Sequence, residues 1–303
     1  MTKISITIPT YNGEKNIKKQ IDRLINDCKK AKIFNFYEII ICDNCSNDNT
    51  KKIVTKYKKK IDTKKIFDIK FYGSKNNLGY PKNFIRATKL SKSKYTFFLC
   101  DDNIPGQNFY IKLYNLFKNK DYNELCFFST NNIPNFKKKS GFDFRELAYV
   151  MNRGAILSGA LLQTKKIKHK YIIKNNLYPQ NSVFIDYYLK YGLKTFNFKS
   201  KINCNTNESI KSKFNDRMKR KNDLAVLDKI NSIDIFYEKK RINFYSLFIC
   251  IYTIYFWSFD VYMTLKKQGE QKIANNFFKA ITSYKRKSLI LISMFLVFLK
   301  YFF

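Results

Sequence analysis

Several residue types are scarce in this chain of 303 residues. It has one histidine, one tryptophan, and only 23 acidic residues. The lone histidine, His169, lies among lysines, and a solvated ring is expected there. Seven cysteines occur at irregular spacing, and the close pair Cys42 and Cys45 has no second pair at a zinc-like distance. These scarcities argue against a zinc or redox centre and favour buried thiols in a reducing compartment.

Acidic residues are scarce relative to the 58 lysines and arginines, which gives a formal net charge of +35. Such a charge attracts nucleic acid, anionic lipid headgroups or phosphorylated substrates. A coding sequence biased toward A and T would also enrich lysine together with asparagine, isoleucine, phenylalanine and tyrosine. Hydrophobic residues make up 45% of the chain, which excludes a disordered protein.

Strand-like and helix-like segments alternate over the first 130 residues. The strand-like segments are short and apolar, and one apolar face at helical spacing (residues 14–31) follows the first of them. This alternation predicts an α/β domain with a mostly parallel sheet covered by helices. Strands are expected at residues 4–8, 37–42, 66–72, 95–100 and 124–129.

One predicted strand delivers two carboxylates to its end. The uncharged run that begins at Tyr95 leads to Asp101, Asp102 and Asn103, and a turn is expected at residues 104–106. An open α/β sheet binds its ligands beyond the carboxyl ends of its strands. The ends at residues 9–12 and 43–44 should lie in the same crevice.

These strand ends resemble the motifs of family 2 glycosyltransferases with the GT-A fold. The resemblance covers about the first 110 residues, and its pattern is closest to abequosyltransferase-like bacterial surface-glycan transferases. It is carried by residues 4–12, residues 38–50, Asn77 to Gly79 with Asn83, and residues 98–103.

The resemblance implies roles for the two acids after the fourth strand. Asp102 would bind the metal, Mn²⁺ or Mg²⁺, and Asp101 would reach the ribose of the nucleotide. A divalent cation held by carboxylate oxygen offsets the charge that grows on a diphosphate leaving group. Asn103 stands where many relatives have a third aspartate, which leaves the site with less negative charge.

The resemblance also implies a nucleotide-sugar site at the other strand ends. Asn44 stands where many relatives carry aspartate, and an amide can both donate and accept, which predicts tolerance of thymidine or cytidine donors. Lys82 is either a basic residue near the donor or a solvated helix lysine. The residues implied for this site are Pro9, Thr10, Tyr11, Asp43, Asn44, Lys82 and Asp101.

An inverting transferase also needs a general base for the acceptor hydroxyl. In the family this base lies on a short helix beyond the sheet, and the segment from Ser182 to Gly192 reads as such a helix. Asp186 matches the position of the base. The alternative is an ordinary surface ion pair between Asp186 and Lys190, which are four residues apart.

The C-terminal part has a different character. We expect a catalytic domain at residues 1–215 and a basic, apolar helical region at residues 216–303. Residues 242–259 carry no charge, and residues 288–303 are apolar except for Lys300. The first run is near the length of a bilayer span but contains Asn243, Ser246 and Ser258, and the second run is short for a span. Helices that lie in or dip into the membrane interface are therefore expected. Core helices of a soluble domain are the alternative.

Taken together, these features predict a metal-dependent, inverting transferase for bacterial surface polysaccharide, such as lipopolysaccharide, lipooligosaccharide or capsule. Its partners would be a nucleoside diphosphate-sugar, a glycan or lipid-linked acceptor and an anionic membrane. No signal peptide precedes the first strand, so the cytoplasmic face of the inner membrane is expected. A nucleic-acid-binding protein and a sugar-nucleotide pyrophosphorylase are the alternatives. The latter needs a glycine-rich loop, which residues 9–13 do not provide.

Overall fold

The computed structural model describes residues 3–62, 66–128, 143–154, 157–172, 178–204, 224–267 and 287–302, with isolated residues between 269 and 278. The chain forms two compact units. The sheet unit comprises residues 1–138, 156–169 and 190–205. The helical unit comprises residues 139–155, 170–189 and 206–303. The predicted domain boundary at 215 and 216 lies outside the described residues.

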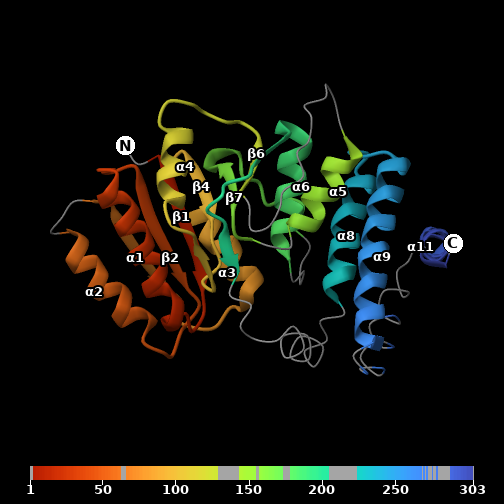
Figure 1. Ribbon diagram of the computed structural model, residues 1–303, viewed down its shortest axis with the longest axis horizontal. Helices are drawn as coiled ribbons and strands as arrows, with labels where there is room; N and C mark the ends of the chain where they lie inside the picture. The colour runs from red at the N-terminus through yellow and green to blue at the C-terminus, as the bar shows by residue number, and fades with distance from the viewer. Residues whose placement is uncertain are drawn as a thin grey trace. The chain divides into compact units, whose positions relative to one another are not determined.

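The sheet unit is built on a seven-stranded sheet with the order β3-β2-β1-β4-β7-β6-β8. Strand β1 lies between β2 and β4 and is parallel to both. Strand β7 is antiparallel to β4 and β6, while β6 and β8 are parallel. The prediction of a mostly parallel α/β sheet is therefore confirmed (Figure 1). The strands are β1 (Ile4–Thr10), β2 (Tyr37–Asp43), β3 (Asp68–Gly73), β4 (Tyr95–Phe98), β6 (Leu125–Phe128), β7 (Ala160–Gln163) and β8 (Leu193–Phe196).

The central strands are buried on both faces. All seven residues of β1 and all seven of β2 are buried, as expected for parallel strands covered by helices. Helix α1 turns one apolar stripe to this sheet, and Ile17, Ile21 and Leu24 are fully buried. Helix α3 contacts β1 and β2, and its Phe84 ring lies 5.4 Å from the ring of Phe98. The helices of this unit are α1 (Glu14–Lys30), α2 (Thr50–Asp62), α3 (Gly79–Leu90), α4 (Phe109–Phe117) and the short η1 (Thr164–Lys166).

A second, two-stranded sheet follows the acidic turn. Strand β5 (Asn103–Pro105) pairs antiparallel with β9 (Ile202–Cys204). The turn expected at residues 104–106 is therefore wrong in part, because Ile104 and Pro105 belong to a strand. Proline is tolerated there because β5 is at an edge and has a single partner strand.

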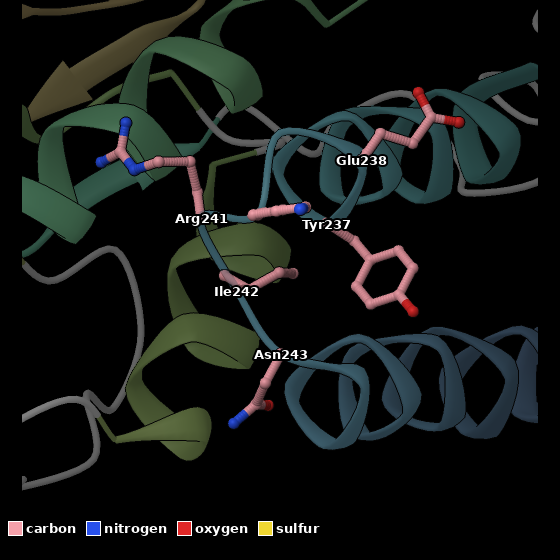
Figure 2. Close-up of a pocket in the computed structure, with 6 residues that line it drawn as sticks. Tyr237, Glu238, Arg241, Ile242 and Asn243 are labelled. Atoms are coloured by element: carbon pink, nitrogen blue, oxygen red, sulfur yellow. The ribbon is translucent and has the colours of Figure 1, made fainter.

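The helical unit contains α5 (Phe144–Arg153), most of α6 (Pro179–Tyr191), α8 (Leu224–Glu238), α9 (Phe244–Lys267) and α11 (Lys287–Phe302). Helix α9 contacts α5, α8 and α11. The turn that joins α8 to α9 is shown in Figure 2. Among the described residues, no helix combines the length and the apolar character that crossing a bilayer requires.

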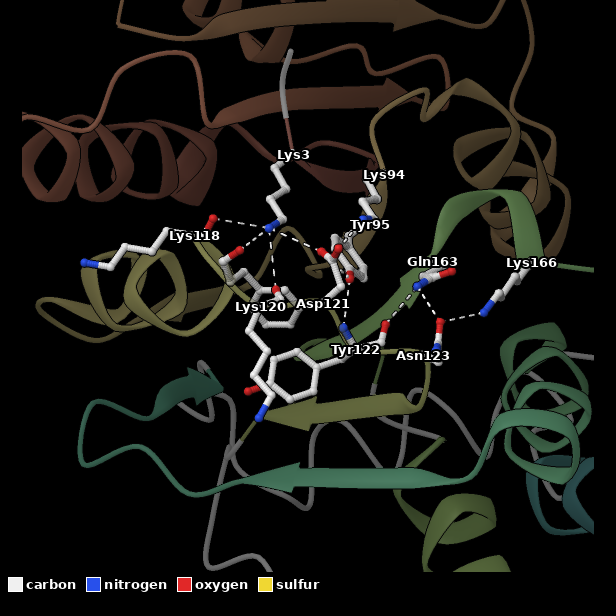
Figure 3. A network of polar contacts seen from close by, with 11 residues as sticks. Lys3, Lys94, Tyr95, Lys118, Lys120, Asp121, Tyr122, Asn123, Gln163 and Lys166 are labelled. Carbon is white, nitrogen blue, oxygen red and sulfur yellow. Dashed lines mark hydrogen bonds and ion pairs between the residues drawn. The ribbon is translucent and has the colours of Figure 1, made fainter.

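The amino ends of β1 and β4 are joined by a polar network (Figure 3). Asp121 forms ion pairs with Lys3, at 3.3 Å, and with Lys94. Its carboxylate also accepts a 3.1 Å hydrogen bond from the hydroxyl of Tyr95. The hydrogen bond from Lys94 is the main cause that holds the pKa of Asp121 below its usual range. These contacts fix the sheet at the edge opposite the acidic turn.

Candidate active site

The carboxyl ends of β1 and β4 form a topological switch point. From β1 the chain continues to β2 and β3 on one side of the sheet, and β4 then pairs with the other side of β1. The register of the parallel pair places Thr7 beside Phe98, so the residues beyond both strands emerge at one edge. Open α/β sheets bind ligands at such a point.

Asp101 is bound to the end of β1. Its Oδ2 accepts a 2.7 Å hydrogen bond from the Thr10 hydroxyl and a 3.1 Å bond from the backbone N–H of Tyr11. Burial raises the pKa of Asp101 above its usual range, and these two bonds offset part of that shift. The structure thus brings together three residues predicted for the donor site.

Gly13 allows this close approach. A Cβ atom at position 13 would lie 2.3 Å from the Thr10 Oγ1 and 3.4 Å from the Asp101 Oδ2. Only a residue without a side chain leaves the bond between Thr10 and Asp101 undisturbed. The backbone N–H of Gly13 is in turn held by the hydroxyl of Thr50, at 3.0 Å.

The turn from Cys100 to Asn103 is held by two side chains that sequence reasoning missed. The Gln20 amide donates to the carbonyl oxygens of Cys100, at 2.6 Å, and Asn103, at 2.8 Å. The Ser158 hydroxyl accepts bonds from the Cys100 N–H and the Asn103 amide, both 2.7 Å long. Both Gln20 and Ser158 are buried. The Asn103 amide is therefore committed to the turn.

Asp102 lies in this fixed turn and is exposed, unlike its neighbour Asn103. Within the described residues, no group of three or more His, Cys, Asp or Glu side chains is arranged to hold a metal. Mg²⁺ and similar hard cations are commonly bound through one or two carboxylates, with phosphates and water as the other ligands. An exposed carboxylate next to Asp101 fits a cation of that kind, bound jointly with a diphosphate.

Asp43 and Asn44 end β2 beside Thr10. The Asp43 carboxylate accepts bonds from the hydroxyl and the backbone N–H of Ser46, which orders the loop after β2. The Asn44 amide donates to the Asn77 Oδ1 and accepts from the N–H of Leu78, both at 2.8 Å. Asn44 therefore positions the loop before α3, and its predicted effect on base choice stays a prediction.

A polar cluster on α3 lies behind this edge, and the sequence reasoning assigned no role to its arginine. Asn83 donates to the carbonyl of Cys42 at 2.8 Å. Arg86, one turn further along α3, donates to the carbonyls of Asp43, at 3.0 Å, and Tyr72, at 2.6 Å. The i, i+3 spacing of Asn83 and Arg86 on a helix face was the available signal. Arg86 thus holds the carboxyl ends of β2 and β3.

The other predicted donor residues differ in their accessibility. Tyr11 is 47% exposed, so its ring can contact a ligand. Pro9 is buried within β1, opposite Cys42 of β2. Lys82 is exposed in the first turn of α3. This exposure agrees with both interpretations of Lys82, as a basic residue near the donor and as a solvated helix lysine.

Asp186 belongs to α6 of the helical unit. It is 3% exposed, and its Oδ1 lies 3.4 Å from the Arg241 Nη1. A carboxylate buried to this degree is not part of a surface ion pair. The helix begins at Pro179 rather than at the expected cap Ser182, while Gly192 follows it with φ of +80°, as expected for a helix end.

His169 and the close cysteine pair have structural contacts. The His169 Nε2 lies 2.6 Å from the Thr88 hydroxyl, and burial lowers the pKa of the ring, with a smaller contribution from Lys89. The prediction of a solvated ring is therefore wrong. The Cys42 thiol bonds to Asn83 at 3.2 Å, and the Cys45 thiol bonds to the carbonyl of Lys75 at 3.4 Å.

Comparisons with known proteins agree with this geometry. Residues 5–266 match the family model described as Glycosyl transferase family 2. The poly(ribitol-phosphate) beta-N-acetylglucosaminyltransferase TarP of Staphylococcus aureus (strain N315) is 32% identical over 117 residues, which are 38% of this chain and 33% of TarP. The poly(ribitol-phosphate) beta-glucosyltransferase of Bacillus spizizenii is 34% identical over 116 residues, which are 38% of this chain and 17% of that enzyme.

The fold has a counterpart among solved structures. The crystal structure of S. aureus TarS 1-349 in complex with UDP gives a TM-score of 0.50 at 17% identity, covering 94% of this chain and 92% of that one. This likeness concerns the fold alone. The matched segments span a third or less of the two sequence relatives, whereas the family model spans most of this chain. The chain belongs to glycosyl transferase family 2.

Proposed function

We propose that this protein transfers a sugar from a nucleoside diphosphate-sugar to a hydroxyl of a glycan acceptor. The observation that carries the proposal is the pair Asp101 and Asp102 at the carboxyl end of β4, with Asp101 bonded to Thr10 of β1. Membership of the family supports the same reaction class. Asp101 is bonded to the end of β1, and Asp102 is exposed at the same edge of the sheet.

The donor would bind along the edge formed by β1, β2 and the acidic turn. Asp101 would accept a hydrogen bond from a ribose hydroxyl, and the exposed ring of Tyr11 would pack on the base. Asp43 and Asn44 shape the neighbouring wall through their bonds to Ser46 and Asn77. The wider base tolerance predicted from Asn44 belongs to this proposal.

Asp102 would hold the divalent cation, Mn²⁺ or Mg²⁺, whose charge stabilises the departing diphosphate. Gln20 and Ser158 fix the turn that presents this carboxylate. In the transfer, the acceptor oxygen attacks the anomeric carbon, the bond from that carbon to the diphosphate breaks, and the nucleoside diphosphate leaves. The acceptor hydroxyl loses its proton to a base.

Asp186 is the residue that we propose as this base. It is buried in α6, and the guanidinium of Arg241 lies beside it. A carboxylate oxygen is a common general base in proteins, and Arg241 is the cation that partners this one in the helical unit. The inverting outcome follows if this single base activates the acceptor for direct displacement.

We further propose that the acceptor is a phosphate-bearing bacterial surface glycan. Two relatives are named for transfer to poly(ribitol-phosphate), and a chain with a net charge of +35 attracts such a polyanion. This proposal includes acceptors in lipopolysaccharide, lipooligosaccharide and capsule. It also includes the resemblance in motif pattern to abequosyltransferase-like enzymes.

A donor-hydrolysis screen tests the proposal. UDP-, dTDP- and CDP-sugars are incubated with the protein and Mn²⁺ or Mg²⁺, and released nucleoside diphosphate is measured. Release of nucleoside diphosphate is the expected result, and a strict preference for UDP-sugars would contradict the base tolerance predicted from Asn44. Formation of nucleoside triphosphate from pyrophosphate would indicate a pyrophosphorylase instead. Hydrolysis of no donor, combined with tight, salt-sensitive binding of oligonucleotides, would favour the nucleic-acid-binding alternative.

A further inference from the structure

The turn between α8 and α9 has an inner and an outer side. On the inner side, the Arg241 guanidinium points toward α6 and lies 3.4 Å from both the Asp186 Oδ1 and the Tyr171 hydroxyl (Figure 2). The Tyr171 ring packs on Phe236 of α8, with 4.9 Å between the ring centroids. The Arg241 guanidinium is therefore hydrogen-bonded within the helical unit, and its charge lies on the inner side of the turn.

The outer side carries two exposed aromatic rings. Phe244 and Tyr245, the first residues of α9, are 56% and 55% exposed. The ring of Tyr237 on α8 lies 6.3 Å from the Phe244 ring, in an edge-to-face arrangement. A cavity of about 560 Å³ opens beside them and is lined by Tyr237, Glu238, Lys240, Arg241, Ile242 and Asn243.

Exposed lysines belong to the same turn. Lys239 and Lys240 are both exposed, and Lys240 lines the cavity. Backbone bonds from Lys240 to Tyr237, at 2.9 Å, and from Arg241 to Phe236, at 2.8 Å, fix the turn. Glu238 is the carboxylate among the cavity-lining residues, so this turn carries two exposed lysines and one acid.

We propose that this outer side, formed by Tyr237, Lys239, Lys240, Phe244 and Tyr245, docks on an anionic bilayer. Lysines with aromatic rings beside them suit the headgroup region, where rings enter the interface and ammonium groups meet lipid phosphates. Residues 244 and 245 project about 100° apart on the helix, so their rings do not form a stacking platform for successive bases. The docking is independent of the proposed sugar transfer.

Vesicle sedimentation with the full chain tests this proposal. The probes are phosphatidylglycerol-containing vesicles and vesicles of phosphatidylcholine alone. We expect binding to the anionic vesicles. The paired substitution Phe244→Ser with Tyr245→Ser, and separately Lys239→Gln with Lys240→Gln, should each weaken it at least tenfold, since each cation contributes about fivefold.

Matched controls separate this surface from the general positive charge. Phe34 is 57% exposed in the sheet unit, and Phe34→Ser removes an equally exposed ring. Lys58→Gln with Lys59→Gln removes two exposed lysines of α2. Both controls should change vesicle binding less than twofold. Equal losses in the patch and control variants would overturn the proposal.

Two further measurements keep the result unambiguous. Thermal melting shows that each variant is folded, and donor hydrolysis reports the sheet unit independently of vesicle binding. Unchanged vesicle binding by folded patch variants would overturn the docking surface. A parallel and equal loss of oligonucleotide binding would also overturn it, in favour of a site for soluble polyanions. Failure of donor hydrolysis with intact patch-dependent vesicle binding would contradict only the proposed function.

Discussion

Thr10, the last residue of β1, donates a 2.7 Å hydrogen bond to the carboxylate of Asp101, which lies three residues after the end of β4. The two residues are 91 positions apart in the chain. Their contact joins the ends of the two strands that flank the switch point. It therefore couples the loop after β1 to the acidic turn.

The first prediction concerns the ionisation of Asp101, which is half-buried. Because burial raises its pKa above the ordinary value of 3.8, the folded state binds the proton more tightly than the unfolded state. This stabilisation is complete below the unfolded pKa and is lost as the pH rises through the folded pKa. Asp101→Asn removes this dependence of stability on pH and keeps a side-chain oxygen that can accept the hydrogen bond from Thr10. Its melting temperature should exceed that of the wild type increasingly as the pH rises, and donor affinity should fall. If the two melting temperatures differ by a constant amount as the pH rises from 3.8, the assignment is contradicted.

The second prediction concerns Asp102. Asp102→Asn should lower donor hydrolysis by about 100-fold or more, because a charged ligand to the cation is lost. Chelation of divalent ions should lower wild-type activity similarly and affect the variant little. Asp68→Asn, at an exposed carboxylate that begins β3, is the matched control and should retain activity. Full activity of Asp102→Asn would exclude this residue as the metal ligand.

The third prediction concerns the support of the acidic turn. Gln20→Met leaves the carbonyl oxygens of Cys100 and Asn103 without this donor, at a cost of about 1–3 kcal/mol in unfolding free energy for each buried group left unpaired. We expect Mn²⁺ affinity, measured by titration, to fall about 10-fold or more, as for other supporting residues of metal sites. Lys19→Met, at an exposed neighbour on α1, should change neither quantity. Unaltered Mn²⁺ affinity in a destabilised Gln20→Met protein would limit Gln20 to a folding role.

The fourth prediction concerns Gly13. The Cβ of Gly13→Ala would lie 2.3 Å from the Thr10 Oγ1, so Thr10 must move away from Asp101. We expect a loss of about 1–3 kcal/mol in unfolding free energy and weaker donor binding by calorimetry. Gly73→Ala adds the same atom 3.5 Å from the Phe71 ring, an ordinary contact, and should behave like the wild type. Equal behaviour of the two variants would show that the packing at Gly13 does not limit donor binding.

The fifth prediction concerns the proposed base. Asp186→Asn should lower sugar transfer by about 10²–10⁴-fold while leaving donor binding intact, because only proton removal is lost. Asp234→Asn, at a buried carboxylate of α8, controls for the removal of a buried charge from the helical unit. Retained transfer by Asp186→Asn would rule out the assignment.

The sequence predicted the parts of the site that depend on local pattern. Buried strands such as β1 and β4 read as apolar runs, and the polar residues at their ends mark the crevice without any tertiary knowledge. Gln20 and Ser158 could not be found this way. Each contacts backbone atoms far away in the chain, and a lone polar residue on an amphipathic helix has the same pattern whether it is buried or solvated. The burial of Asp186, and its pairing with Arg241, likewise depend on how α6 packs against the turn after α8.

The clamps on the acidic turn have a thermodynamic consequence. Gln20 and Ser158 already hold Cys100 and Asn103 without any ligand, so the Asp102 carboxylate sits on backbone whose geometry is set by folding. Donor binding then pays little conformational entropy to order this turn, and the interaction energy is available for affinity.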